Sequence, residues 1–278
     1  MPELPEVQAH AERLTTTFGG AVLARFEPLR FTVLKTADPS PDTAADCTLV
    51  EMRRRGKYLV LDFGSMCFVV HLMQAGRLLP EDTPGKAPSH GQARWHFHDG
   101  RSLLLTEAGR ERKAGVWCVR ADALDGPPLD RLGPDALDID AESLAASFKA
   151  VNMRVHGYLR DQHHIAGLGR MLANEICHRA RLSPFAMTGS LDTAKVHAVA
   201  DAIRSCALEN LEAERALAAM SKSADRPGTV HGRIGQPCSS CADTVRSVTY
   251  SSYTVAYCPT CQTGGVVLAD NTTSRFLK

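Results

Sequence analysis

Cys238-Ser-Ser-Cys241 and Cys258-Pro-Thr-Cys261, with sixteen residues between them, decide the fold at the C-terminal end of this chain. Each short knuckle presents two thiolates to one face of a tetrahedral ion, so the doubled spacing predicts a four-cysteine zinc site. Four thiolates leave no open coordination position, and this zinc is therefore expected to hold structure and to perform no chemistry. Two disulfides or a redox pair are the alternatives, and an intracellular setting disfavours both.

The segment between the knuckles, residues 245–257, is rich in β-branched and aromatic residues. This composition predicts a β-hairpin and makes the C-terminal part a zinc ribbon. The other five of the nine cysteines lie in apolar or helical stretches and are expected to be reduced, buried, small hydrophobic side chains: Cys47, Cys67, Cys118, Cys177 and Cys206.

Upstream of the ribbon the sequence has a helical character. Its apolar periodicity predicts helices at residues 141–150, 152–159, 170–180 and 191–220, the last with an interruption. Between two of them, the turn Gly167-x-Gly169 would direct backbone N–H groups toward a phosphate. Glycines that only turn a helix hairpin are the alternative. Residues 129–134 contain Gly and Pro and predict a linker.

The N-terminal part has a β-rich character. Residues 20–120 contain short apolar and β-branched runs separated by Gly, Pro and Asp, which predicts an antiparallel β-sandwich. A helix is expected at residues 5–17, with a buried stripe formed by Leu4, Val7, Ala11 and Leu14. The fold class is therefore α+β. The predicted domains are a β-sandwich (1–128), a helical domain (129–228) and the ribbon (229–278).

Length and charge set wider limits. The chain has 278 residues and a formal net charge of +1, so any nucleic-acid surface must be a local patch. No apolar run approaches a membrane span, and the first residues lack the pattern of a signal peptide. A soluble, cytoplasmic monomer is expected. The densest basic run comprises Arg53, Arg54, Arg55 and Lys57, for which a solvated strand edge is the alternative reading.

The N-terminal segment could supply catalytic groups. Its sequence is Met1-Pro2-Glu3-Leu4-Pro5-Glu6-Val7. Removal of Met1 would leave Pro2 with a free secondary amine, and an α-amino group titrates near pH ~8, well below a lysine. Such an amine can attack an aldehyde-like carbon and form a Schiff base, while Glu3 could protonate the group that leaves. The alternative is that the prolines only start a helix.

Together these residues resemble the formamidopyrimidine-DNA glycosylase and endonuclease VIII (Fpg/Nei) family over essentially the whole chain. The motifs that carry the resemblance follow the family order: Pro2-Glu-Leu-Pro-Glu-Val7, Arg54-Arg-Gly-Lys-Tyr-Leu59, His71-Leu-Met-Gln-Ala-Gly76, Asp161-Gln162, Ala166-Gly-Leu-Gly169, Asn174-Glu175 and Val230-His-Gly-Arg-Ile-Gly-Gln-Pro-Cys238. The resemblance implies a β-sandwich, a helix–two-turns–helix domain and a zinc finger, with damaged DNA as the partner.

The resemblance also implies base excision followed by strand scission. Carried over to this sequence, Pro2 is the Schiff-base nucleophile and Glu3 is the general acid. Lys57 acts in β-elimination and contacts the phosphate beside the lesion. Supporting roles are implied for Glu6, Asp161 and Glu175, with a solvent-facing position as the alternative for Glu6 and structural capping or hydrogen bonding as the alternative for the other two.

The damaged base must leave the stack, and a side chain then fills the hole. Gln74 matches that task. A glutamine at this place is more like endonuclease VIII than like the 8-oxoguanine branch, in which the matching residue is a methionine. Oxidised pyrimidines are therefore the favoured lesions. His90 is a further candidate DNA contact.

Three departures from the family pattern stand out. The ribbon arginine expected five residues before the third cysteine is Tyr253, whose ring could stack on an unpaired base. The asparagine expected after the glycine turn is Arg170, which could make an ionic phosphate contact. The wedge loop is replaced by residues 106–114, where Arg110, Arg112 or Lys113 could enter the duplex or face phosphate. Arg246 is a shifted basic group in the ribbon, with surface exposure as its default reading.

These departures, with the tail at residues 262–270, are similar to an actinobacterial endonuclease VIII-like branch. Because the ribbon arginine is replaced, β-elimination products are expected to exceed δ-elimination products. Two rival hypotheses stay open. One is a DNA-damage binding protein that kept the scaffold and lost turnover. The other is a zinc-ribbon protein that binds RNA or protein, which leaves the N-terminal constellation unexplained.

Overall fold

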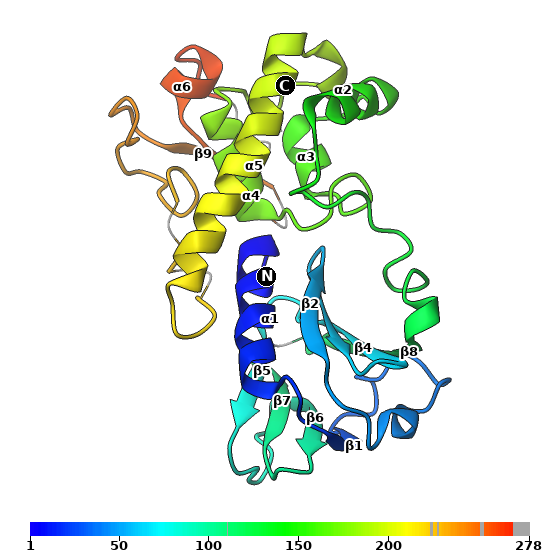
Figure 1. Ribbon diagram of the computed structural model, residues 1–278. Helices are drawn as coiled ribbons and strands as arrows, with labels where there is room; N and C mark the ends of the chain where they lie inside the picture. Colours follow the sequence, from blue (N-terminus) through cyan, green and yellow to red (C-terminus); the bar gives the residue numbers. More distant parts are fainter. Residues whose placement is uncertain (110, 223–224, 227, 251–252, 269–278) are drawn as a thin grey trace. The chain divides into compact units, whose positions relative to one another are not determined.

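The structure is a computed structural model that describes residues 1–109, 111–222, 225–226, 228–250 and 253–268 (Figure 1). Contacts divide the chain into two compact units. The first comprises Met1–Arg131 and Glu214–Met220, and the second comprises Leu132–Ala213 and Ser221–Lys278. The finer division at residues 128 and 228 stays a prediction. No helix in the described parts of the chain is long and apolar enough to cross a membrane.

The first unit contains the predicted antiparallel β-sandwich, which is confirmed. One sheet has the order β1 (Leu23–Pro28), β6 (Gly91–Phe97), β7 (Ser102–Glu107) and β5 (Gly76–Glu81). The other has the order β2 (Glu51–Arg55), β3 (Tyr58–Asp62), β4 (Met66–His71) and β8 (Gly115–Arg120). All neighbours in both sheets are antiparallel.

Aromatic side chains join the two sheets in a common core. The Phe68 ring on β4 lies 5.2 Å from the Phe26 ring on β1 and 5.7 Å from the Trp95 ring on β6. The Phe68–Trp95 planes cross at 89°, the edge-to-face geometry that suits two aromatic quadrupoles. This core makes the sandwich a rigid support for residues at its edges.

Helix α1 (Leu4–Phe18) packs against β2 of this sandwich (Figure 1). The predicted stripe of Leu4, Val7, Ala11 and Leu14 is buried, each side chain being at most 1% exposed. Each fully buried leucine contributes about 1.5–3 kcal/mol relative to an exposed one. The Thr15 hydroxyl donates to the Met52 carbonyl at 3.0 Å and accepts from the Met52 N–H at 2.7 Å, which fixes the helix along the strand.

The second unit holds helices α2 (Ala141–Ala150), α3 (Val155–Arg160), α4 (Arg170–Arg179) and most of α5 (Thr193–Arg215). Helix α2 has the predicted bounds, but α3 starts later than residue 152. The reason is that Arg154 and Met187 form an antiparallel β-bridge, and the Met153 N–H donates to the Thr188 hydroxyl at 3.0 Å. These contacts hold the preceding residues extended.

The predicted helix to residue 220 is too long, because α5 ends at Arg215. The Arg13 guanidinium donates to the carbonyl oxygens of Glu214 at 3.0 Å and Leu217 at 3.3 Å. A charged donor there satisfies carbonyl groups that a continued helix would use internally.

The predicted ribbon hairpin is present as β9 (Arg246–Thr249) and β10 (Thr254–Tyr257), followed by α6 (Pro259–Thr263). Val230, Val245 and Ala256 pack with Cys238 and Cys258 in a small core of their own. The hairpin therefore lies directly against the cysteine knuckles.

Candidate active site and metal centre

The start of α1 places two acidic side chains beside Pro2. Pro2 is buried, Glu3 is the N-cap in an extended conformation, and Glu3 and Glu6 form a reciprocal capping box. The Glu6 carboxylate accepts the Glu3 N–H at 2.6 Å. Glu3 is only 3% exposed and Glu6 only 4%, so the solvent-facing reading of Glu6 is wrong. Glu6 instead fixes the backbone that carries Pro2 and Glu3.

Lys57 lies in the tight turn between β2 and β3. Gly56 has φ 57°, a left-handed conformation that costs glycine little, and Lys57 is 7% exposed. The Arg54 guanidinium donates to the Gln8 side chain on α1 at 3.1 Å and to the Gly56 carbonyl at 3.0 Å. Arg54 therefore ties the turn that carries Lys57 to the first turns of α1.

This region can support general acid and nucleophilic chemistry. Lysine and glutamate are almost never fully buried unless they are paired. Here the structure buries both Glu3, which follows Pro2 in sequence, and Lys57, in the turn that Arg54 ties to α1. Low solvent exposure strengthens the electrostatic influence of each charge on groups beside it.

His71 supports the turn that carries Gln74. The sequence showed His71 only as part of a motif and assigned it no role. His71 pairs with Tyr58 in the ladder of β3 and β4, and its Nδ1 accepts the Met73 N–H at 3.1 Å. Burial, and then the positive charge of Lys57, lower the pKa of His71 to about 4. A neutral imidazole therefore holds Met73 at φ 54° and leaves Gln74 exposed at the turn.

The replaced wedge loop connects β7 and β8. Its ends are tied by the buried Glu107 carboxylate, which accepts the Ala114 N–H at 2.6 Å. Arg112 donates to the Ser89 carbonyl at 3.1 Å, and Lys113 pairs with Glu111 at 2.9 Å. Arg110 lies outside the described residues.

His90 lies beside this loop, half-buried. Its carbonyl accepts the Glu107 N–H at 2.9 Å. His90 therefore supports one end of the loop through its backbone.

The four ribbon cysteines converge, as the spacing predicts. All four Sγ atoms lie within 4.8 Å of one another, with 3.9 Å between Cys238 and Cys261 and 3.4 Å between Cys241 and Cys258. A tetrahedral ion with Zn–S bonds of about 2.3 Å requires sulfur–sulfur edges of about 3.8 Å. The residues therefore fit a four-coordinate metal ion.

Hydrogen bonds prepare one of these sulfurs to be a thiolate. Burial alone would raise the pKa of Cys238, but donors from the Ser240 backbone, His178 and the Cys241 backbone lower it to about 6. His178 Nε2 lies 3.3 Å from the Cys238 Sγ. Burial and the neighbouring sulfurs raise the pKa of Cys258 to about 11. Four adjacent thiolates repel one another, and a divalent cation is what would let all of them ionise.

Helix α4 anchors the segment that leads into the ribbon. The buried Glu175 carboxylate accepts the N–H groups of Thr229 at 2.7 Å, Val230 at 3.1 Å and His231 at 2.8 Å, and also the Thr229 hydroxyl. Asn174 bonds His231 at 2.8 Å and His156 at 3.0 Å. With its donors supplied by the backbone of this segment, Glu175 has a structural role.

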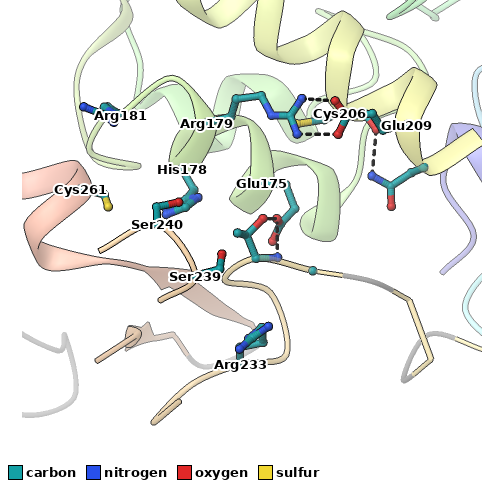
Figure 2. A pocket seen from close by; sticks show the side chains of 13 residues that line it. Glu175, His178, Arg179, Arg181, Cys206, Glu209, Arg233, Ser239, Ser240 and Cys261 are labelled. Carbon is teal, nitrogen blue, oxygen red and sulfur yellow. Dashed lines mark hydrogen bonds and ion pairs between the residues drawn. The ribbon is translucent and has the colours of Figure 1, made fainter. Parts of the chain in front are cut away.

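A cavity of about 520 Å³ lies among α4, α5 and this segment (Figure 2). Figure 2 shows Arg179 and Glu209 facing each other across its upper wall, joined by two contacts of 2.5 Å. Glu175 also lines the cavity, and its carboxylate accepts the Thr229 N–H. These charges serve contacts within the protein.

The glycine turn is held by Gln162, which takes one of the backbone N–H groups that were expected to face a phosphate. Gly167 has φ 103°, a conformation that disfavours any other residue, and the Gln162 amide accepts the Gly167 N–H at 3.0 Å and donates to the Leu168 carbonyl at 2.8 Å. Arg170 is exposed at the first position of α4. Asp161 ends α3, and its carboxylate accepts the N–H and contacts Nδ1 of His163 at 2.9 and 2.7 Å.

Tyr253 does not present an isolated ring. It stacks on Tyr250 with centroids 4.7 Å apart, and the Arg160 guanidinium lies 4.1 Å from its centroid. Sequence reasoning missed Arg160, and no local pattern could have found it, since the two residues are far apart along the chain. Arg246, in contrast, is exposed on β9.

Two family models match this chain. The N-terminal domain of formamidopyrimidine-DNA glycosylase matches residues 1–116, and its H2TH domain matches residues 132–221. The formamidopyrimidine-DNA glycosylase of Thiobacillus denitrificans is 31% identical, over 94% of this chain and 100% of that protein. An uncharacterized formamidopyrimidine-DNA glycosylase-like protein of Mycobacterium tuberculosis is 42% identical, over 55% of this chain and 99% of that protein.

Solved structures share the fold. Lactococcus lactis Fpg in complex with DNA that contains an abasic site has a TM-score of 0.84 at 20% identity, over 94% of this chain and 99% of that one. The same protein with DNA that contains an oxidized pyrimidine has a TM-score of 0.86 at 22% identity, over 94% and 100% of the two chains.

Proposed function

This chain belongs to the formamidopyrimidine-DNA glycosylase family of DNA N-glycosylases, and from that membership we propose that it excises damaged bases from DNA and cleaves the resulting abasic site through Pro2. The observation that carries the proposal is the burial of Glu3, which directly follows Pro2, and of Lys57 in the β2–β3 turn that Arg54 ties to α1. The proposed partner is damaged DNA, as in the complexes of the Lactococcus lactis relative.

In the first step the Pro2 nitrogen attacks C1′ of the damaged nucleotide. The bond between C1′ and the base breaks, and Glu3 donates the proton that the departing base requires. The attached nitrogen then loses its proton, the C1′–O4′ bond breaks and O4′ takes up a proton, which opens the sugar and gives an iminium ion between Pro2 and C1′. The reaction requires removal of Met1, because a peptide bond to Met1 would withdraw the nitrogen lone pair.

In the second step the iminium draws electrons and acidifies the C2′ proton. Loss of that proton expels the 3′-phosphate by β-elimination, and water then hydrolyses the iminium to release Pro2. The Lys57 ammonium stabilises the departing phosphate by a charge-assisted hydrogen bond. Tyr253 carries no guanidinium to assist a second elimination, so β products should exceed δ products on a sequencing gel. Dominant δ products would contradict this part of the proposal.

Two further parts concern the lesion and the metal. Gln74, exposed on the turn that His71 holds, fills the space of the extruded base, and oxidised pyrimidines are the proposed lesions. A screen of oligonucleotides with oxidised pyrimidines or 8-oxoguanine tests this, and a preference for 8-oxoguanine would refute it. The four ribbon cysteines hold Zn²⁺ and give it a structural role.

The covalent mechanism is tested by borohydride reduction in the presence of duplex DNA with an abasic site. The wild-type protein, with Met1 removed as confirmed by mass spectrometry, should form a stable adduct. Pro2→Gly should lower the adduct yield at least tenfold, whereas Pro5→Ala, the matched change at the next proline, should keep it. Damage-specific binding without an adduct would instead support a DNA-damage binding protein.

A further inference from the structure

Two arginines, Arg154 at the N-cap of α3 and Arg160 at its last position, lie over aromatic rings of the second unit. The Arg160 guanidinium carbon is 4.1 Å from the Tyr253 ring centre, and that of Arg154 is 5.3 Å from the Phe185 ring centre. Arg154 also donates to the Tyr250 hydroxyl at 3.0 Å, and the two tyrosine rings stack at an angle of 15°. These five side chains, all in the second unit, form what we call the arginine–aromatic array.

Within the described residues, neither guanidinium of the array is paired with a carboxylate. Arg179 of the same unit shows the contrast, since Glu209 takes both of its terminal nitrogens at 2.5 Å. A guanidinium that lies over a ring can use its face there and keep N–H donors for another partner. Arg154 gives one of its donors to Tyr250, whereas Arg160 is held over Tyr253 with its donors available.

The groups around Arg160 do not neutralise it. Asp161 follows it in sequence, but that carboxylate contacts the N–H and Nδ1 of His163. The His156 ring is buried and lies nearly parallel to Tyr253, with centroids 6.3 Å apart. Burial, and then the charge of Arg160, lower the pKa of His156 to about 3, so this imidazole is neutral at physiological pH.

We propose that the Arg160 guanidinium, held over the Tyr253 ring, binds a phosphate of the DNA backbone. The planar fork of an arginine matches two phosphate oxygens, and the ring reduces the conformational freedom that binding must remove. Arg160 thereby supplies from α3 the cation that residue 253 lacks. This inference rests on the proposed function, because it takes DNA to be the ligand.

The test is equilibrium binding to a duplex with a non-cleavable abasic-site analogue, measured at several salt concentrations. Arg160→Gln should lower the affinity about tenfold and reduce the slope of log affinity against log salt by about one, as expected for one lost phosphate contact. Arg160→Lys should keep the slope and lose part of the affinity. Arg204→Gln, at an exposed arginine of α5, is the matched control and should stay within about twofold of wild type.

Equal affinities and slopes for Arg160→Gln and Arg204→Gln would overturn the proposal. Thermal unfolding and zinc content verify that each variant is folded. If Arg160→Gln does not fold, Arg160→Lys decides, and wild-type affinity in that variant refutes the planar contact. Borohydride trapping on the same proteins separates the two proposals: a wild-type protein without an adduct refutes the Pro2 mechanism and leaves the salt slopes to judge Arg160.

Discussion

The two units build their sites in different ways. In the first unit the candidate catalytic groups are few: Pro2 and Glu3 are adjacent at the start of α1, and Lys57 lies in the tight turn between β2 and β3. In the second unit three side chains of α4 form hydrogen bonds with residues that lie 54 to 60 positions away in the sequence. These are Asn174, Glu175 and His178.

This difference separates chemistry from architecture. A group that supplies a proton or an electron pair can be removed while its neighbours keep their positions. A buried carboxylate or thiolate that binds several donors or a metal cannot be removed in this way. Its loss leaves unsatisfied polar groups in the interior. Substitution of Glu3 should therefore change rates in a folded protein, and substitution of Glu175 or of a ribbon cysteine should change folding.

The largest expected effect is loss of the metal in the second unit. Cys258→Ser should reduce bound zinc from one equivalent to none, because binding of a structural zinc contributes on the order of 10 kcal/mol to folding. Elemental analysis and thermal unfolding would show an unfolded second unit beside a folded first unit. Cys47→Ser is the control and should keep the zinc. A full zinc equivalent in Cys258→Ser would contradict the four-cysteine assignment.

The next effect belongs to the first unit and should leave the fold intact. Glu3→Gln keeps an oxygen that can cap α1 but loses the proton donor, so base excision should fall about 100- to 10,000-fold. Borohydride trapping on a preformed abasic site should change by only a few-fold, since that step needs the Pro2 amine. Glu51→Gln, at an exposed glutamate, should leave both rates unaltered. An equal fall of excision and trapping in Glu3→Gln would argue against a separate acid.

A smaller effect is expected from the anchor of the segment that leads into the ribbon. Glu175→Gln replaces an acceptor of four hydrogen bonds by an amide whose NH₂ group faces N–H donors, which should lower the free energy of unfolding of the second unit by about 2–3 kcal/mol. Denaturant unfolding measures this, with Glu142→Gln on the exposed face of α2 as the control. Wild-type stability in Glu175→Gln would show that the anchor is dispensable.

The smallest effect is a pH dependence of the stability of the first unit. Burial lowers the pKa of His10 and of His71 to about 4 in the first unit. Unfolded histidines titrate near pH ~6.5, so between about pH 6.5 and 4 the unfolded chain binds protons that the folded chain does not. Stability should therefore be undiminished by these groups above pH ~6.5 and should fall as the solution is acidified.

His71→Asn tests this, because its amide oxygen can still accept the Met73 N–H. The pH dependence of the unfolding free energy should weaken by about 1.4 kcal/mol per pH unit within that window. Urea unfolding at pH 7 and pH 5.5 gives the comparison. The same slope in the variant and the wild type would mean that His71 is protonated in the folded state.

Elements that depend on contacts between residues close in sequence were predicted correctly, and helix ends that depend on distant contacts were not. The ribbon hairpin, α2 and the buried stripe of α1 are set by spacing and periodicity over a few residues, and these predictions are confirmed. The start of α3 and the end of α5 are not, because a bridge from Arg154 to Met187 and the reach of Arg13 to Glu214 override the local helical pattern. The sequence left Glu6 open between a supporting role and a solvent-facing position, and its burial and its bond to the Glu3 N–H exclude the second.

By itself the sequence determined the chemical identities: a proline and a glutamate at the N-terminus, a lysine after a glycine turn and four thiolates at knuckle spacing. These follow from residue type and short-range geometry. Only the tertiary structure decided that the Glu175 carboxylate accepts the N–H groups of a backbone segment. It also decided that His71 is a neutral support for the Gln74 turn and that Arg160 lies over Tyr253. Those roles come from burial and from partners distant along the chain, and packing brings such partners together only in the folded protein.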